Sequence, residues 1–175
     1  MRAKGFTLIE LLITLIIVSV LAAAAGPNIS QYIEQERLRG ALFNLKQKLV
    51  YARSEAIKRN VTIFVSGSAG ADWCIGLSLS ADCDCSSSDP AQADACTLAM
   101  NGTRVIHRLT SEDYSGVSIS QLRSFRFDGI RGLPWDSGSF AGTILLNSAS
   151  YSGAVVISRI GRVKACGNLS GMEDC

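Results

Sequence analysis

The chain has 175 residues, 18% of them charged and 47% hydrophobic, and a formal net charge of +2 at pH 7. This length predicts one domain, with a separate element attached at most. The hydrophobic fraction exceeds what a small soluble domain needs, so such a domain alone does not account for the chain. The net charge is too small to point to a class of partner.

Charge and cysteine are unevenly distributed. Residues 60–103 contain five aspartates and no Lys or Arg, whereas residues 104–164 contain eight basic residues against four acidic ones. All six cysteines come after residue 73. Cysteine-rich domains are typical of oxidising compartments. The sequence therefore predicts that the part of the chain after residue 60 lies outside the cytoplasm.

The N-terminal segment is apolar over residues 6–25 except at Glu10. About 20 residues are enough to cross roughly 30 Å of hydrocarbon as a helix. Basic Arg2 and Lys4, an apolar stretch and the small residues 22–25 would also suit a secretory signal peptide. Glu10 argues against that interpretation, because a carboxylate in a membrane costs about 2.5–3.5 kcal/mol near the bilayer centre and less near its edge. A carboxylate kept at such a place is expected to have a function.

Residues 4–12, KGFTLIELL, resemble the type III signal of type IV prepilins and pseudopilins. The resemblance implies that a prepilin peptidase cleaves between Gly5 and Phe6 and methylates the new amino group of Phe6. It also implies that Glu10 neutralises the N-terminal ammonium of a neighbouring pilin in a helical filament. Two opposite charges in an apolar bundle each lose their burial penalty by pairing.

The leader, residues 1–5, carries the basic residues that keep the N-terminus cytoplasmic by the positive-inside rule. Residues 6–27 are then a transmembrane or filament-core helix, and residues 28–59 an amphipathic helix. Gly26 and Pro27 predict a kink inside one long helix rather than its end. The amphipathic half has one apolar stripe at helical spacing, formed by Leu38, Leu42, Leu45, Leu49, Ala52 and Ala56.

Residues 60–175 predict a β-rich head. Short alternating runs indicate strands at 61–66, 73–79, 103–109, 116–120, 123–127, 142–146, 154–160 and 162–166. Turn signals occur at 128–129, 132–134, 136–138 and 150–153, and the acidic stretch 81–95 is expected to be a loop. The fold class is therefore α+β, a long helix packed on a mainly antiparallel β head.

The order of these elements resembles the GspH/FimT group of pilin-like proteins, and the ending GRVKAC with a last cysteine at 175 is most similar to the FimT and FimU minor pilins. The resemblance implies a minor type IV pilin that joins a pilus or its tip or priming complex and supports pilus-dependent functions. It implies an inner-membrane protein with a periplasmic head that then reaches the pilus at the cell surface. A DNA-binding minor pilin for natural transformation and a GspH-like minor pseudopilin of type II secretion are the alternatives.

Cys166 and Cys175 are expected to pair, because the loop between them is short and the related pilins often end in this way. Cys74, Cys83, Cys85 and Cys96 pair among themselves in one of three ways. Cys83 and Cys85 are too close to bond each other, so Cys74 is expected to take one of them and Cys96 the other. The spacings lack the usual zinc knuckle, and the aspartates lack the glycine of a calcium loop, so no metal or other cofactor is predicted.

No enzyme is predicted, because the catalytic and phosphate-binding motifs are missing. His107, the only histidine, lies in a predicted strand and is interpreted as a packing or surface residue. Arg162 and Lys164 would point to one face of a strand with Val163 on the other, and Arg159 could join them across Gly161. In FimT-like pilins such an element is associated with double-stranded DNA, so these three residues are the candidates for that partner. Attraction of this kind would be independent of sequence and weakened by salt.

Overall fold

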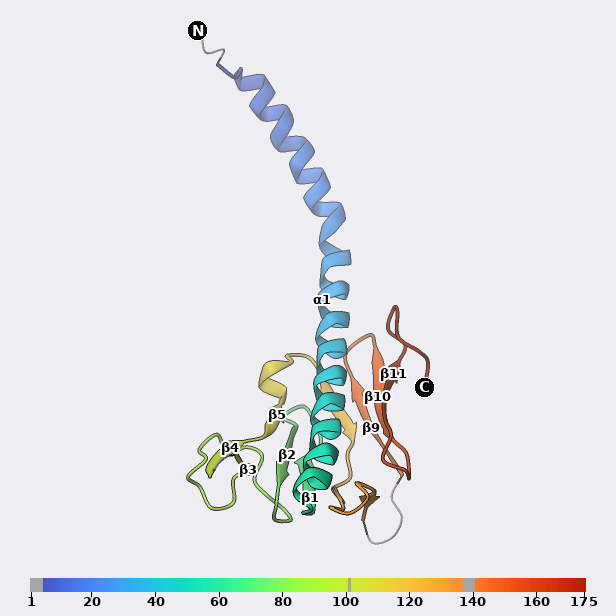
Figure 1. Ribbon diagram of the computed structural model, residues 1–175. Helices are drawn as coiled ribbons and strands as arrows, with labels where there is room; N and C mark the ends of the chain where they lie inside the picture. Colours follow the sequence, from blue (N-terminus) through green and yellow to red (C-terminus); the bar gives the residue numbers. More distant parts are fainter. Residues whose placement is uncertain (1–4, 101, 137–140) are drawn as a thin grey trace. The chain divides into compact units, whose positions relative to one another are not determined.

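Figure 1 shows the computed structural model, which describes residues 5–100, 102–136 and 141–175, with the side chains of 24–28 and 100 left aside. The chain divides into two compact units, residues 1–33 and residues 34–175. The first is helical, and the second is the head. Each unit is described by itself.

One helix, α1 (Leu8–Arg59), takes up the N-terminal third of the chain. It is continuous through Gly26 and Pro27, as predicted, while the kink expected there stays a prediction. Its C-terminus is a Schellman motif: Asn60 has a φ of 53°, and the amides of Asn60 and Val61 donate to the carbonyls of Ile57 and Ala56. In the described part of the chain, no helix is both long and apolar enough to cross a membrane. The transmembrane or filament-core helix expected over 6–27 stays a prediction.

The described part of the head contains two larger antiparallel sheets and one small one. The first has five strands in the order β5-β2-β1-β7-β8, the second has the order β11-β10-β9-β6, and the third pairs β3 with β4. The strands are β1 Ile63–Ser68, β2 Cys74–Ser78, β3 Thr97–Met100, β4 Thr103–Ile106, β5 Arg108–Thr110, β6 Ser118–Gln121, β7 Phe125–Phe127, β8 Pro134–Trp135, β9 Gly142–Asn147, β10 Ser152–Ile157 and β11 Val163–Gly167. A 3-10 turn, η1 (Ser111–Asp113), follows β5. The predicted α+β fold is confirmed.

The core of the head forms where the sheets meet the second half of α1. All six residues of the predicted apolar stripe are fully buried, together with Ala41. Large side chains from both sheets complete the core, among them Phe127, Ile144 and Val155, together with Trp73 just before β2. The helix packs so closely on β10 that position 153 holds a glycine: a side chain there would overlap the Leu42 side chain. Burial of this stripe therefore fixes the helix on the sheets.

Three features of the strands differ from prediction. The segment 103–109, predicted as one strand, forms two strands: β4 pairs with β3, and β5 pairs with β2. The change of partner occurs at His107, whose amide donates to the Cys96 carbonyl and whose carbonyl accepts from the Leu77 amide. β3 follows the acidic loop and was not predicted. β8 lies where 132–134 predicted a turn, and it is an edge strand that begins with proline, as strand prolines usually require. The turn predicted at 136–138 extends outside the described residues.

Candidate processing and assembly site

The start of the first unit combines an exposed segment with a capped helix. Gly5, Phe6 and Thr7 precede the first helical residue, Phe6 is 83% exposed, and no atom of the described residues lies within 4 Å of a side chain placed at Gly5. The bond between Gly5 and Phe6 is thus open to a peptidase. The predicted cleavage itself stays a proposal.

Glu10 and Thr7 form a capping box. The Thr7 amide and hydroxyl donate to Glu10 Oε2 at 3.0 and 2.9 Å, and the Glu10 amide donates to Thr7 Oγ1 at 3.3 Å. The two side chains thus satisfy donors that a helix start leaves unpaired. In a single subunit the Glu10 carboxylate is therefore hydrogen-bonded within its own chain. The Thr-x-x-Glu spacing is visible in the sequence, but it was not used in the prediction.

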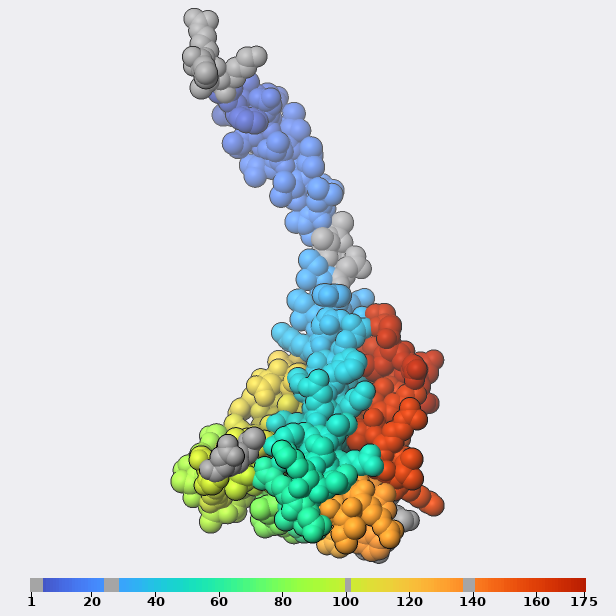
Figure 2. Space-filling view, viewed as in Figure 1, coloured from blue at the N-terminus to red at the C-terminus, as the bar shows by residue number. Residues whose placement is uncertain are grey.

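Apolar side chains remain exposed on the face of α1 that points away from the sheets. Figure 2 shows the second half of α1, in cyan and teal, at the surface between the yellow segment and the red C-terminal segment. Phe43, Val50 and Ile57 are 43%, 47% and 44% exposed and are spaced by seven residues. We call these three residues the outer stripe. Residues seven apart lie close to one line along a helix, so the outer stripe is a single apolar row that a second helix could cover.

The predicted basic residues lie together at the end of the second sheet, but one of them is already paired. Arg159 and Arg162 are exposed, and Val163 is buried, as the predicted alternation requires. Lys164 Nζ, however, lies 2.6 Å from Glu173 Oε2. The hydrogen bond and charge of Lys164 lower the pKa of the Glu173 carboxyl, so this acid stays ionised beside the basic residues. The prediction did not include Glu173, because only the closed C-terminal loop brings it there.

The turn between β10 and β11 is held by an arginine from α1. Arg53 donates to the carbonyls of Gly132, Ile160 and Gly161 at 3.1, 3.0 and 2.9 Å. Gly161 has a φ of +77°, and a side chain there would lie 2.8 Å from Arg53 Nε. The backbone conformation and the contact with Arg53 therefore require glycine at position 161, whether or not a ligand binds nearby.

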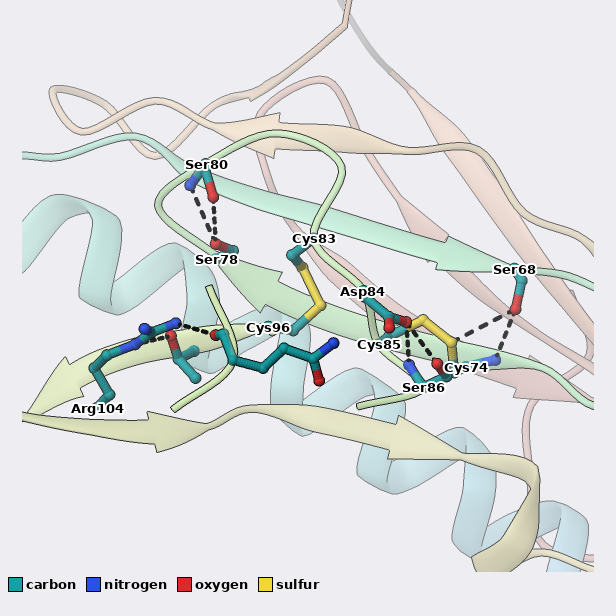
Figure 3. The surroundings of a disulfide bond; sticks show 12 residues. Ser68, Cys74, Ser78, Ser80, Cys83, Asp84, Cys85, Ser86, Cys96 and Arg104 are labelled. Carbon is teal, nitrogen blue, oxygen red and sulfur yellow. Dashed lines mark hydrogen bonds between the residues drawn. A yellow bond between two sulfur atoms is a disulfide. The ribbon is translucent and has the colours of Figure 1, made fainter. Parts of the chain in front are cut away.

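The described cysteines form three disulfides: Cys74–Cys85, Cys83–Cys96 and Cys166–Cys175. The C-terminal pair is the predicted one. The other two disulfides are one of the pairings that the sequence left open. Their loops overlap along the chain, because Cys83 lies inside the loop that Cys74 and Cys85 close. Figure 3 shows both bridges over β2. Residues 81–95 are a loop, as predicted, with one bridge between Asp84 and Ala95.

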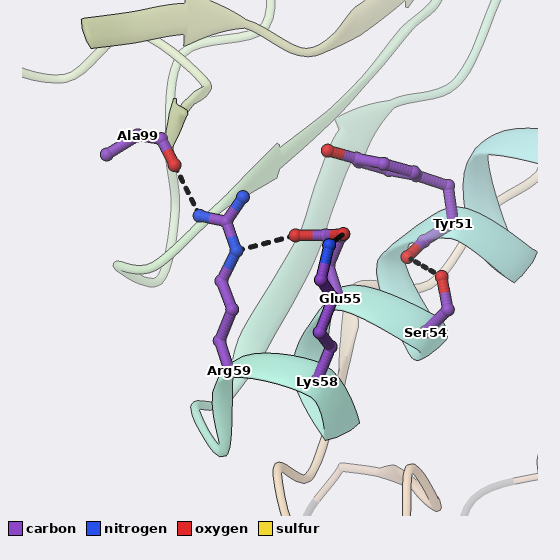
Figure 4. Close-up of polar contacts among 6 residues, drawn as sticks. All are labelled: Tyr51, Ser54, Glu55, Lys58, Arg59 and Ala99. Carbon is purple, nitrogen blue, oxygen red and sulfur yellow. Dashed lines mark hydrogen bonds and ion pairs between the residues drawn. The ribbon is translucent and has the colours of Figure 1, made fainter. Parts of the chain in front are cut away.

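His107 occupies a packed site beside α1. Its ring stacks on Tyr51 with centroids 5.2 Å apart, and its Nε2 has no hydrogen-bond partner among the described residues. Burial lowers the pKa of His107, the charges of Lys48 and Arg59 lower it further, and Glu55 acts against them. Glu55 is itself buried and paired with Arg59 at 2.5 Å (Figure 4).

The described His, Cys, Asp and Glu residues include no group that could hold a metal ion.

Comparison with known proteins identifies a sequence motif and a family that match the chain. Residues 1–26 match the prokaryotic N-terminal methylation motif, and residues 43–161 match the family described as type II transport protein GspH. Two crystal structures of the type IV minor pilin FimU of Pseudomonas aeruginosa are similar at 16% sequence identity. One has a TM-score of 0.50 and covers 76% of this chain and 90% of FimU, and the other has a TM-score of 0.46 with coverages of 73% and 90%. No curated protein sequence matches the chain.

The long helix, the antiparallel sheets and the methylation motif define a pilin-like subunit, which is a structural protein and not an enzyme. The family match spans well over half of the chain, so the chain belongs to the GspH family of minor pilins and pseudopilins. Membership implies processing by a prepilin peptidase, residence in the inner membrane as a prepilin, and assembly with other pilins into a pilus or pseudopilus.

Proposed function

We propose that this protein is a minor pilin that is incorporated into a type IV pilus, at its tip or in its priming complex. The observation that carries the proposal is the outer stripe. Three large apolar side chains lie partly exposed in one row along the helix, and burying them against a second helix in a filament is favourable. The pilus is favoured over a secretion pseudopilus by the ending at 161–175, which resembles that of the FimT and FimU minor pilins.

Glu10 supports the same proposal through its capping box. Before assembly, Thr7 supplies the hydrogen bonds of the carboxylate. On assembly the N-terminal ammonium of a neighbouring Phe6 is a stronger partner, because a charge-assisted hydrogen bond in an apolar bundle exceeds one to a neutral hydroxyl. The Glu10 carboxylate thus has hydrogen-bond donors both before and after assembly.

The test is incorporation into surface filaments. A strain lacking the gene is complemented with the wild type, Val50→Lys or Leu79→Lys, and sheared pili are probed for the subunit. Leu79 is a matched control, because it is also 47% exposed but lies outside α1. We expect the wild type and Leu79→Lys in the pili and Val50→Lys only in the membrane. Equal incorporation of Val50→Lys would contradict the role of the outer stripe.

The same strains separate the pilus from type II secretion, the function named by the family description. If the deletion leaves piliation intact and abolishes secretion of exoproteins, the protein is a pseudopilin and the pilus proposal fails.

DNA binding is a second candidate, favoured by one observation: Arg159 and Arg162 are both exposed on the two sides of the Gly161 turn. Glu173 opposes it by neutralising Lys164. A gel shift with linear duplex DNA at low salt tests this candidate. Arg162→Ala should abolish retardation and Glu173→Gln should increase it. No retardation by the wild type would exclude this candidate.

A further inference from the structure

The outer face of the five-stranded sheet carries a row of side chains with no structural task in the core. Along β1 and β7, Ile63, Val65, Phe125 and Phe127 are buried toward α1. Because side chains alternate between the faces of a strand, Phe64 and Arg126 point the opposite way. Trp135 of β8 is 45% exposed, whereas Trp73, the other tryptophan of the chain, is buried.

Strand register brings three of these outward side chains side by side. Phe64 is directly opposite Arg126, and Arg126 is directly opposite Trp135. Residues opposite each other in a ladder share a face and lie within contact distance. The Arg126 guanidinium lies 5.8 Å from the centre of the Phe64 ring, a cation–π distance. We call Phe64, Arg126 and Trp135 the aromatic platform.

The disulfide loop forms a wall beside this platform. It packs directly on the outer face of β2, since a side chain at Gly76 would overlap Cys96 and lie 3.1 Å from Cys85 Cβ. Figure 3 shows the two disulfides holding the loop over β2, with Asp84 and Ser86 beside it. The loop is thus fixed in place, and it leaves the platform on β1, β7 and β8 uncovered.

Two hollows meet between the wall and the platform. One has a volume of about 270 Å³ and contains the platform, and the other has about 330 Å³ and lies along the loop. Both are lined by Ser66, Asp82 and Ser124, so they form one groove. Their combined size falls within the roughly 300–1,000 Å³ of small-molecule sites.

Polar side chains line the groove where a ligand can reach them. Ser66 lines both hollows, so its hydroxyl is positioned to bind a hydroxyl group of a ligand. Carboxylates of Asp82 and Asp136 lie in the same hollow, and Asp136 is held by Arg123 at 2.5 Å.

The same features exclude two classes of ligand. An extended peptide cannot add a strand in the groove, because β1 is hydrogen-bonded to β2 on one side and β7 on the other. A polyanion such as DNA is disfavoured, because the groove has Asp82, Asp84 and Asp136, against one lining cation, Arg126. The groove suits a neutral ligand that has one apolar face and many hydroxyl groups.

We propose that this groove is a saccharide-binding site. A pyranose ring has an apolar C–H face that stacks on an aromatic ring, and hydroxyl groups that donate to carboxylates and accept from arginine and serine. Trp135 provides the stacking surface, Arg126 and Asp82 bind hydroxyls at its edge, and Ser66 binds one at the floor. The proposal goes beyond the proposed function and does not rest on it.

Calorimetric titration of the full chain tests the proposal. The protein is kept in a zwitterionic detergent without a sugar headgroup, and the probes are chitotetraose, cellotetraose and maltotetraose. At least one probe should bind the wild type with a Kd below about 10 mM. Trp135→Ala should weaken that binding at least about tenfold and Ser66→Ala severalfold, whereas Ile130→Ala, an exposed side chain outside the groove, should not change it.

Two results would overturn the proposal: no probe binds the wild type, or Trp135→Ala binds as well as the wild type. If no probe binds and Trp135→Ala also loses co-purification with other pilins, the groove is instead a contact between subunits. Equal thermal unfolding midpoints of the wild type and the variants show that each effect arises in the groove rather than from misfolding.

Discussion

The contact between Leu42 of α1 and Gly153 of β10 allows a quantitative test of how the helix is fixed to the head. Leu42 is fully buried, so Leu42→Ala should leave a cavity and lower the free energy of unfolding by about 3 kcal/mol. Gly153→Ala should cost about 1–2 kcal/mol, because the added methyl group overlaps the Leu42 side chain. The backbone of Gly153 is not in the left-handed region, so alanine is allowed there.

The double variant decides whether this contact is the cause. With Leu42 shortened, the methyl group at 153 enters the space that the leucine leaves. We therefore expect the two losses to be non-additive by about 1–2 kcal/mol in the favourable direction.

Guanidinium unfolding with the disulfides intact, followed by tryptophan fluorescence, measures all three variants. Val50→Ala on the exposed face of α1 is the control and should change stability by less than about 0.5 kcal/mol. Strict additivity of the two losses would refute the packing argument.

Three further predictions concern the head. The pKa of His107 is lower in the folded than in the unfolded protein, so the folded state binds fewer protons. The free energy of unfolding should therefore fall as the pH drops below about 6.5. Chemical unfolding measured from pH 8 to 5 tests this, and His107→Gln should flatten the pH dependence. Arg53→Met should lower the free energy of unfolding by about 2–3 kcal/mol, because three hydrogen bonds to carbonyls are lost; Arg53→Lys should restore only part, and full restoration would contradict the need for a forked donor. Cys166→Ser with Cys175→Ser should cost about 2–3 kcal/mol in chemical unfolding, and an unchanged midpoint would show that the short loop is held by other contacts.

Features that depend on local periodicity could be predicted from the sequence. The stripe from Leu38 to Ala56 follows helical spacing, and every predicted member is buried. The methylation motif depends on a few fixed residue types next to one another, and its match is confirmed. Both signals lie within a few helical turns and need no knowledge of tertiary structure.

Features that depend on contacts between distant segments could not be predicted. The choice between Cys83 and Cys85 as the partner of Cys74 depends on how the loop crosses β2. Glu173 reaches Lys164 because the chain turns back after β11, where the Gly167 amide donates to the Glu173 carbonyl and Cys166 is bonded to Cys175. β8 was missed because a two-residue strand has no visible alternation, and its proline indicates a turn as readily as an edge.

The order of cysteines in the head has a consequence for biogenesis. As the chain leaves the membrane, Cys74 and Cys83 are the first two thiols to meet an oxidant, yet they are not bonded to each other in the folded protein. A bond made in order of emergence would be the wrong one. Correct pairing therefore requires either that β1 and β2 align before oxidation or that thiol–disulfide exchange repairs the first bond. If exchange is the route taken, the supply of this subunit depends on the isomerase capacity of the compartment as well as on peptidase cleavage.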